Sequence, residues 1–186
     1  MIYHETPLKG AYLIDLERRE DNRGFFARTF CAREFEAHGL NPIGRQCNAS
    51  FNHRRGTLRG MHIQIEPATE TKYIRCTAGG IFYAIIDMRE ESPTFLRHFE
   101  LELTAENRRA LYVPGRFAIG YQTLADNTEV HYQVGEFYTP GCERGIRYND
   151  PHFKINWPLP VSEISEKDAN WPLFNVNDWV TPSVAV

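Results

Sequence analysis

Cysteine is scarce in this chain, and no two cysteines lie at a metal-binding spacing. The four cysteines are far apart, at Cys31, Cys47, Cys76 and Cys142, and form no C-x-x-C pair. Structural zinc sites and disulfide frameworks normally show closely or regularly spaced cysteines. The sequence therefore predicts reduced, cytosolic thiols and a fold that does not depend on disulfides.

The chain also lacks an excess of positive charge and a long apolar run. Its 21 Lys and Arg against 24 Asp and Glu give a net charge of -3, which argues against nucleic acid as a partner. No apolar segment approaches the roughly 18 residues of a membrane-spanning helix, and residues 1–7 show no signal-peptide pattern. We expect a cytoplasmic protein that binds neither nucleic acid nor membrane. Its 186 residues suit one globular domain, 1–186.

Strand-forming segments dominate what is present. Eight short segments are rich in β-branched or aromatic residues and are bounded by Gly, Pro, Asn or Asp: residues 11–16, 58–65, 72–77, 80–88, 97–103, 110–113, 120–123 and 128–134. Their regular spacing predicts an all-β fold, an antiparallel sandwich or barrel. Helix is expected only at 32–38, before Gly39, and in a short turn where Ser165 caps 166–168.

Alternate side chains of a strand point to opposite faces, which sorts the candidate site residues. Along 58–64, one face carries Leu58, Gly60, His62 and Gln64, and the other carries Arg59, Met61 and Ile63. Along 128–134, the apolar face carries Val130, Tyr132 and Val134. We therefore expect His62 and Gln64 to point the same way, and Tyr132 to point into the barrel.

His62, Gln64, Lys72 and Tyr132 form a candidate polar cluster inside the barrel. An unpaired buried polar group costs about 1–3 kcal/mol, so such a cluster needs partners or a ligand. It suits proton abstraction beside a carbonyl, because histidine is a base near neutral pH, a phenol can return a proton and an ammonium can stabilise an enolate oxygen. Asp168 could orient His62, or could simply belong to the capped turn. Spacing alone equally allows His62 and Tyr132 to be ordinary core residues.

Two segments resemble the paired motifs of the cupin superfamily, small jelly-roll barrels that often bind a metal through histidines. They are GMHIQ at residues 60–64 and PGRFAI at residues 114–119. The metal pattern is broken, because Gln64 and Ile119 stand where further histidines are expected. One imidazole cannot hold a transition metal with high affinity. We therefore expect a cupin-like jelly-roll barrel with no metal and no cofactor.

Ordered motifs extend along nearly the whole chain: DNRGFF (21–26), QCNAS (46–50), LRGMHIQ (58–64), DMR (87–89), SPTF (92–95), EVHY (129–132), NDP (149–151), WP (157–158) and SEKD (165–168). In this order they resemble the dTDP-4-dehydrorhamnose 3,5-epimerase family. The resemblance implies a metal-free jelly-roll homodimer that epimerises a nucleotide-linked 4-keto-6-deoxyhexose. Because function depends on the site, its residues have to be considered separately.

The resemblance also implies roles for individual side chains. His62 is the expected base, paired with Asp168, while Tyr132 is the proton donor and Lys72 lies against the keto oxygen. Arginine binds two diphosphate oxygens at once through its planar fork. The expected contacts with the nucleotide sugar are Arg23 and Arg59 at the diphosphate or sugar, Tyr138 against the nucleobase, and Gln46, Asn48, Glu143 and Lys167.

Three residues depart from the family pattern. Ile119 replaces a histidine, Tyr83 replaces an aspartate, and Arg28 replaces a glutamate that contacts the nucleotide. Ile119 and Arg28 are therefore counted among the positions that face the ligand. The changes leave several alternatives: epimerisation at C3, C5 or both, a 3,4-ketoisomerase-like reaction, a different nucleotide sugar, or a non-catalytic barrel that binds a nucleotide sugar. Retention of all four catalytic candidates favours an epimerase.

Overall fold

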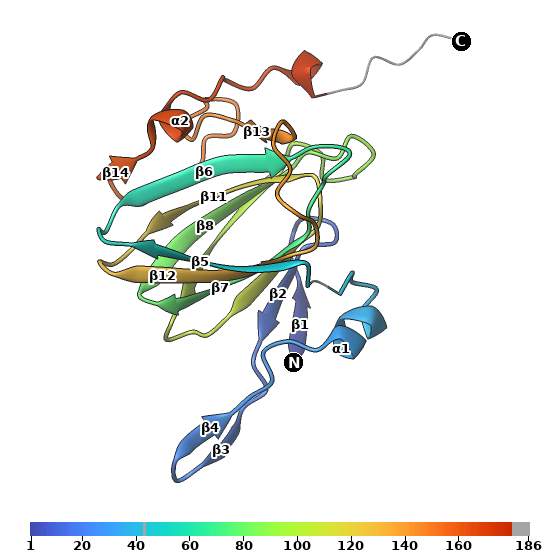
Figure 1. The fold of residues 1–186 in the computed structure, drawn as a ribbon, viewed down its shortest axis with the longest axis vertical. Helices are drawn as coiled ribbons and strands as arrows, with labels where there is room; N and C mark the ends of the chain where they lie inside the picture. The colour runs from blue at the N-terminus through green and yellow to red at the C-terminus, as the bar shows by residue number, and fades with distance from the viewer. Residues whose placement is uncertain (43, 180–186) are drawn as a thin grey trace.

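Two facing β-sheets form the body of the protein (Figure 1). The structure, a computed structural model, describes residues 1–42 and 44–179. The first sheet has the order β1 (Ile2–Glu5), β2 (Tyr12–Asp15), β10 (Ala110–Val113), β7 (Lys72–Ala78), β12 (Thr128–Val134) and β5 (Gln46–Asn52). The second has the order β13 (Glu143–Gly145), β6 (Thr57–Gln64), β11 (Phe117–Thr123), β8 (Gly80–Asp87) and β9 (His98–Thr104), and β14 (Glu163–Ile164) pairs with β6.

The smaller elements lie outside the two sheets. The hairpin of β3 (Arg19–Asp21) and β4 (Gly24–Phe26) extends away from the body (Figure 1). Helix α1 (Ala32–Ala37) ends one residue before the predicted position, and α2 (Glu166–Ala169) and the 3-10 turn η1 (Val176–Asp178) follow late in the chain. Among the described residues, no helix has the length and apolar character needed to cross a membrane.

The chain crosses repeatedly from one sheet to the other, as in an antiparallel jelly roll. β5 and β7 belong to the first sheet while β6 and β8 belong to the second, and β10 to β12 alternate in the same way. The predicted all-β, cupin-like jelly roll is confirmed. All eight predicted strands are present, with ends that differ by three residues or fewer.

Strand β5 is the main element that the sequence pattern did not predict. Its sequence, QCNASFN, contains no β-branched residue. It is held instead by continuous pairing with β12, from Gln46 opposite Val134 to Asn52 opposite Thr128. Tertiary pairing therefore overrides a weak local preference for strand.

The core lies between the two sheets. Ile74 and Val130 from the first sheet pack against Ile81, Ile85 and other apolar side chains from the second. The alternation predicted for β12 is confirmed, because Val130 and Val134 are buried and Tyr132 packs against the same core. Burial of this apolar surface is the main contribution to folding.

The alternation predicted for β6 is wrong at Arg59. Ile119 lies opposite His62 and the next residue of β11, Gly120, lies opposite Gly60, so Met61 has no opposite residue on β11. Such a bulge adds one residue and reverses the faces beyond it. Arg59 and His62 therefore both face the barrel interior, although they are three residues apart.

Glycine is required where this bulge brings two strands together. Gly60 has a φ of +121°, and a Cβ there would lie 2.5 Å from the Cα of Gly120. A Cβ on Gly120 would in turn lie 2.6 Å from the sulfur of Met61. The close contact of β6 with β11 therefore depends on both glycines.

The C-terminal segment, residues 146–179, covers the outer face of the second sheet. Its Ile146 and Phe153 are buried with Met61 and Ile86, and Trp157 packs beside Phe82 with the ring centroids 5.7 Å apart. Figure 1 shows this segment above β6, where it carries β14 and α2. The segment thereby brings α2 beside the strand that carries His62.

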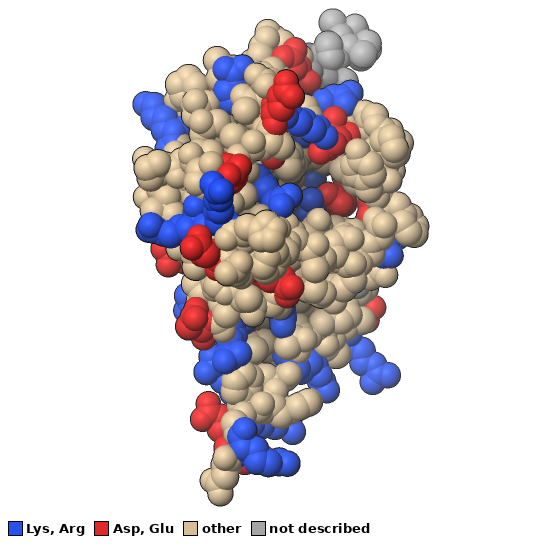
Figure 2. All heavy atoms as spheres, turned by 60° about the vertical axis from the view of Figure 1, so that its left-hand side comes forward, with Lys and Arg blue, Asp and Glu red and all other residues tan. Residues whose placement is uncertain are grey.

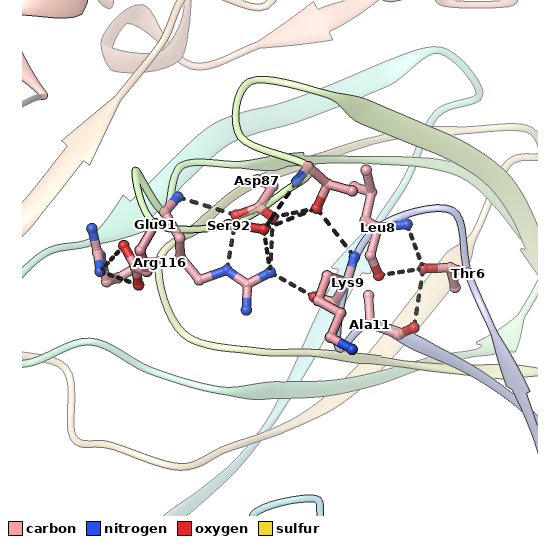
Figure 3. Close-up of polar contacts among 10 residues, drawn as sticks. Thr6, Leu8, Lys9, Ala11, Asp87, Glu91, Ser92 and Arg116 are labelled. Atoms are coloured by element: carbon pink, nitrogen blue, oxygen red, sulfur yellow. Dashed lines mark hydrogen bonds and ion pairs between the residues drawn. The ribbon is translucent and has the colours of Figure 1, made fainter.

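A buried carboxylate fixes the end of β8 to the N-terminal turn (Figure 3). Asp87 is fully buried and accepts hydrogen bonds from Arg89 through Nε and Nη2, both at 2.8 Å, and from the hydroxyls of Ser92 and Thr94, both at 2.6 Å. Thr94 accepts from the backbone N–H of Lys9 at 3.1 Å. Every member has a partner, so the network has a structural role.

We predict that Asp87→Asn lowers the free energy of unfolding by about 3–5 kcal/mol, because it breaks a buried ion pair. Burial acts to raise the pKa of Asp87, but Arg89 and the two hydroxyls hold it below its ordinary value of 3.8. The stabilisation by ionised Asp87 is therefore complete above pH 3.8, the ordinary pKa of the carboxyl group, and is lost as the pH falls through the lower pKa of the folded state. Urea titrations at several pH values should show that the difference in the free energy of unfolding between the wild type and Asp87→Asn becomes smaller at acidic pH.

Glu91→Gln is the matched control, because Glu91 forms an exposed ion pair with Arg116 at 2.9 Å in the same region (Figure 3). It should leave the urea midpoint nearly unchanged. Equal effects of the two substitutions would contradict a structural role for the Asp87 network.

Candidate active site

A cavity of about 160 Å³, which we call the inner cavity, opens between the two sheets. It brings together three of the four predicted catalytic residues and two predicted ligand contacts. Its lining residues are Ser50, Arg59, His62, Lys72, Ile74, Tyr83, Ile119, Gly120, Tyr121 and Tyr132. Chemistry-bearing side chains from both sheets therefore face one shared space.

Gln64 does not join this cluster, contrary to the sequence prediction. Its amide donates to the backbone carbonyls of Ala68 at 3.1 Å and Phe137 at 3.4 Å, and its side-chain oxygen accepts from the N–H of Thr139 at 2.9 Å. These bonds occupy the amide with loop backbone. Gln64 therefore fixes two loops and is not part of the inner cavity.

Asp168 from α2 binds His62 from β6. The His62 Nε2 lies 2.6 Å from the Asp168 Oδ1, and the other carboxylate oxygen accepts from the backbone N–H of Gly60 at 3.1 Å. Trp171 Nε1 donates to the same Oδ1 at 3.3 Å. The hydroxyl of Ser165 accepts from the Asp168 N–H at 3.1 Å, so the predicted helix cap is confirmed. Asp168 thus belongs to the capped turn and orients the imidazole as well.

The environment keeps the Asp168 carboxylate ionised. Burial acts to raise the pKa of Asp168, but the hydrogen bond and charge of His62, with the Gly60 and Trp171 donors, hold it below its usual value. An ionised carboxylate at Nε2 favours the tautomer with its proton on that nitrogen. The Nδ1 of His62 has no hydrogen-bond partner within the described parts of the chain, which leaves it able to accept a proton.

Tyr132 and Lys72 face the same cavity from the first sheet. Burial, with the nearby Tyr121 and Glu70, raises the pKa of Tyr132, although Arg59 acts to lower it. The phenol therefore stays protonated near neutral pH and can act as a proton donor. The Lys72 ammonium lies 6.0 Å from the centre of the Tyr132 ring.

Glu70 is a site residue that the sequence analysis missed. Its Oε1 lies 2.5 Å from the Lys72 ammonium, and both side chains are largely buried. Because a buried charge requires a partner, this carboxylate keeps the ammonium in the barrel. The sequence could have indicated Glu70, because it is an acidic residue two positions before Lys72, on the loop that leads into β7.

A larger space, the outer hollow, adjoins the inner cavity. It has a volume of about 440 Å³, and Arg59 and His62 line both spaces. Its other lining residues are Thr57, Leu58, Glu143, Glu163, Ile164, Ser165, Lys167 and Asp168. Figure 2 shows basic side chains in and around a hollow on this side of the molecule. The outer hollow can therefore hold the remainder of a ligand whose reacting part lies in the inner cavity.

Five predicted ligand contacts lie in or beside these spaces. Glu143 binds the Lys167 ammonium and lies 3.4 Å from the Tyr138 hydroxyl, and the Gln46 side-chain oxygen accepts from the Tyr138 N–H at 3.1 Å. Asn48 lies opposite Tyr132 in the β5–β12 register. Residues from separate strands and loops are therefore connected around one opening.

Residues 5–176 match the model of the family described as dTDP-4-dehydrorhamnose 3,5-epimerase. The chain belongs to this family. It is therefore an isomerase, a carbohydrate epimerase by family.

Individual epimerases resemble the chain over most of its length. The epimerase of Methanothermobacter thermautotrophicus is 39% identical over 170 residues, 90% of this chain and 91% of the relative. The crystal structure of the Elizabethkingia anophelis epimerase superposes with a TM-score of 0.90 at 36% identity, over 94% of this chain and 96% of that one. The crystal structure of ChmJ, a 3'-monoepimerase from Streptomyces bikiniensis, in complex with dTDP-quinovose superposes with a TM-score of 0.82 at 30% identity, over 91% of this chain and 86% of that one.

Two predicted ligand contacts of this epimerase lie outside both spaces. Arg23, in the projecting hairpin, is 90% exposed and pairs with Asp21 at 2.6 Å. Arg28 pairs with Glu34 at 2.9 Å, and Glu34 also binds the N-terminal amine. Contact of either arginine with a ligand remains a prediction, because neither lines the inner cavity or the outer hollow.

The other two departures from the family pattern do line the inner cavity. Ile119 lies directly opposite His62 in the β11–β6 register. Tyr83 is fully buried and stacks on Tyr121 with the ring centroids 6.4 Å apart. The described residues of this epimerase contain no group of three His, Cys, Asp or Glu arranged to hold a metal.

Gly145 of β13 sets the position of Trp171, and we predict that Gly145→Ala displaces this ring. An added Cβ would lie 2.2 Å from two carbons of the Trp171 ring. Overpacking of this kind costs about 1–3 kcal/mol, and the loss should appear in urea titrations together with a changed tryptophan fluorescence. Gly44→Ala is the control, because no atom lies within 4 Å of its added Cβ. Unchanged stability and fluorescence in Gly145→Ala would contradict this assignment.

Proposed function

We propose that the protein inverts one or both carbons beside the keto group of a dTDP-linked 4-keto-6-deoxy sugar. The observation that supports this most is that His62, which is hydrogen-bonded to Asp168, and Tyr132 line the same cavity from opposite sheets. Inversion needs a base on one side of the carbon and an acid on the other. The two-sheet arrangement provides both.

The proposed reaction begins when the imidazole of His62 takes the proton from the carbon beside the carbonyl. Asp168 stabilises the resulting imidazolium, and the Lys72 ammonium stabilises the enolate oxygen. Tyr132 then gives its proton to the opposite face of the same carbon. Exchange with solvent removes the proton from His62 and returns one to Tyr132, so no cofactor is consumed.

The nucleotide is proposed to occupy the outer hollow. Arg59 lines both spaces and its fork suits a diphosphate, while Lys167 adds positive charge. Tyr138 is 60% exposed and offers a ring for a nucleobase. ChmJ, a similar structure, binds dTDP-quinovose, which supports a dTDP sugar for this chain.

Inversion of a single carbon is the second candidate. Ile119 places an apolar side chain opposite the base, and ChmJ is a 3'-monoepimerase. A 3,4-ketoisomerase-like reaction and a non-catalytic sugar-binding barrel are the remaining alternatives, and the experiment below separates all of them.

We also propose a cytoplasmic homodimer in which Arg23 reaches the ligand of a second copy. The exposed Phe25 and Phe26 in the same hairpin support this arrangement, because apolar side chains on a projecting hairpin suit burial against a partner. Arg23 can then contact a ligand although it lies outside the inner cavity of its own subunit.

Incubation with dTDP-4-keto-6-deoxyglucose in deuterated water, followed by NMR, tests the reaction. We expect deuterium at C3, C5 or both. The labelled position identifies which carbon loses its proton, and the configuration of the product shows whether that carbon is inverted. His62→Ala should abolish exchange, whereas Tyr132→Phe should permit exchange but block inversion. Exchange that survives in His62→Ala would show that another residue is the base. Tight binding without any exchange in the wild type would favour the binding barrel, and migration of the keto group would favour the ketoisomerase.

Complementation tests the shared site. Arg23→Ala should raise KM by about 10- to 100-fold, because a hydrogen bond to a charged group contributes about 1.5–3 kcal/mol. Mixing Arg23→Ala with the inactive His62→Ala should restore activity, since mixed dimers have one site with an intact base and an intact arginine. Arg19→Ala in the same hairpin is the control. If light scattering shows dimers but the mixture of the two variants gains no activity, then Arg23 does not reach the ligand of a second copy.

A further inference from the structure

Tyr83 lines the inner cavity, and its buried hydroxyl has no partner among the described residues. Tyr83 is 0% exposed, and no described residue offers its hydroxyl a hydrogen bond. Its ring nevertheless lines the cavity that holds His62 and Tyr132. An unpaired buried polar group costs stability, so folded proteins rarely retain one without a reason.

The neighbouring side chains explain why the protein itself does not satisfy this hydroxyl. The Tyr121 ring stacks on Tyr83, but its hydroxyl lies 2.9 Å from the Ser50 hydroxyl and 3.4 Å from the Asn52 amide. Ile74 and Ile119 present only hydrocarbon to the cavity. Tyr83 therefore contributes to this cavity a buried hydroxyl that has no partner among the described residues.

Two other buried polar atoms lack a partner among the described residues, and they differ in position. The Tyr3 hydroxyl belongs to a ring that packs with Phe35 on the opposite side of the first sheet. Gln133 lines a separate hollow together with Tyr73 and His131. Neither residue lines the inner cavity. Of the three unpaired buried groups in the described parts of the chain, only the Tyr83 hydroxyl belongs to a residue that lines the candidate active site.

Tyr83 is suited to act as a neutral donor. Burial, with Tyr121, Glu70 and Tyr132 nearby, raises the pKa of Tyr83 well above its ordinary value, so the phenol keeps its proton. A neutral phenol can donate to a keto or hydroxyl oxygen and also accept from a hydroxyl.

We infer that Tyr83 determines sugar specificity by hydrogen bonding an oxygen atom on the hexose ring, while Ile119 makes an apolar contact beside it. This inference rests on the proposed function, because it takes the inner cavity as the place of the sugar. It assigns Tyr83 to the sugar and not to the nucleotide. A site with a buried polar group discriminates strongly against ligands that leave it unpaired.

Tyr83→Phe removes only the hydroxyl, so calorimetry with dTDP and with dTDP-quinovose tests the inference. The affinity for dTDP should stay within about twofold of wild type, while that for dTDP-quinovose should fall by about 5- to 10-fold. The unfolding midpoint should stay the same or rise, because the substitution removes an unpaired polar group.

Tyr112→Phe is the matched control. The Tyr112 hydroxyl accepts from the backbone N–H of Asn41 at 3.0 Å and lies in the cluster around Phe35, away from the inner cavity. This variant should unfold more readily and bind both ligands as the wild type does.

Three results would overturn the inference: unchanged dTDP-quinovose affinity in Tyr83→Phe, an equal loss of affinity for dTDP and dTDP-quinovose, or wild-type protein that binds dTDP-quinovose no more tightly than dTDP.

Deuterium exchange in the wild type distinguishes failure of the inference from failure of the proposed function. If the wild type exchanges deuterium but Tyr83→Phe binds dTDP-quinovose with unchanged affinity, the inference is rejected and the proposed function stands. Sugar affinity that depends on Tyr83, without exchange, would reject the proposed reaction and keep the inference.

Discussion

The Asp168 carboxylate connects the C-terminal segment to the barrel and to the candidate base at the same time. It accepts from the backbone of Gly60, from His62 and from Trp171, and its own N–H is capped by Ser165. One buried, ionised group therefore fixes the bulged part of β6, the orientation of the imidazole and the position of α2. The apolar packing of the C-terminal segment on the second sheet keeps this carboxylate away from water.

The inner cavity combines paired charges with neutral phenols. His62 pairs with Asp168, Lys72 pairs with Glu70, and both pairs lie beside apolar side chains. Opposite charges held close together make burial tolerable, while burial raises the pKa of Tyr83 and Tyr132 and so keeps these two hydroxyls protonated. A barrel wall can in this way present a base, an acid and a cation within one small volume.

Composition and local pattern predicted the parts of the fold that depend on apolar strands. β10 and β12 were predicted with their observed ends, and Ser165 was predicted as a cap. The polar strand β5 depends on its partner, and the bulge in β6 depends on two glycines that meet across strands, so alternation alone misplaced Arg59. Because His62 and Asp168 are 106 positions apart, the residues alone offered their pairing only as one of two alternatives, and the family resemblance was needed to favour it.

The late position of α2 in the chain has a consequence for biosynthesis. The ribosome completes every strand of the two sheets up to β12 before it adds Asp168. A chain synthesised only as far as β12 therefore contains His62 without its carboxylate, and α2 supplies that partner later.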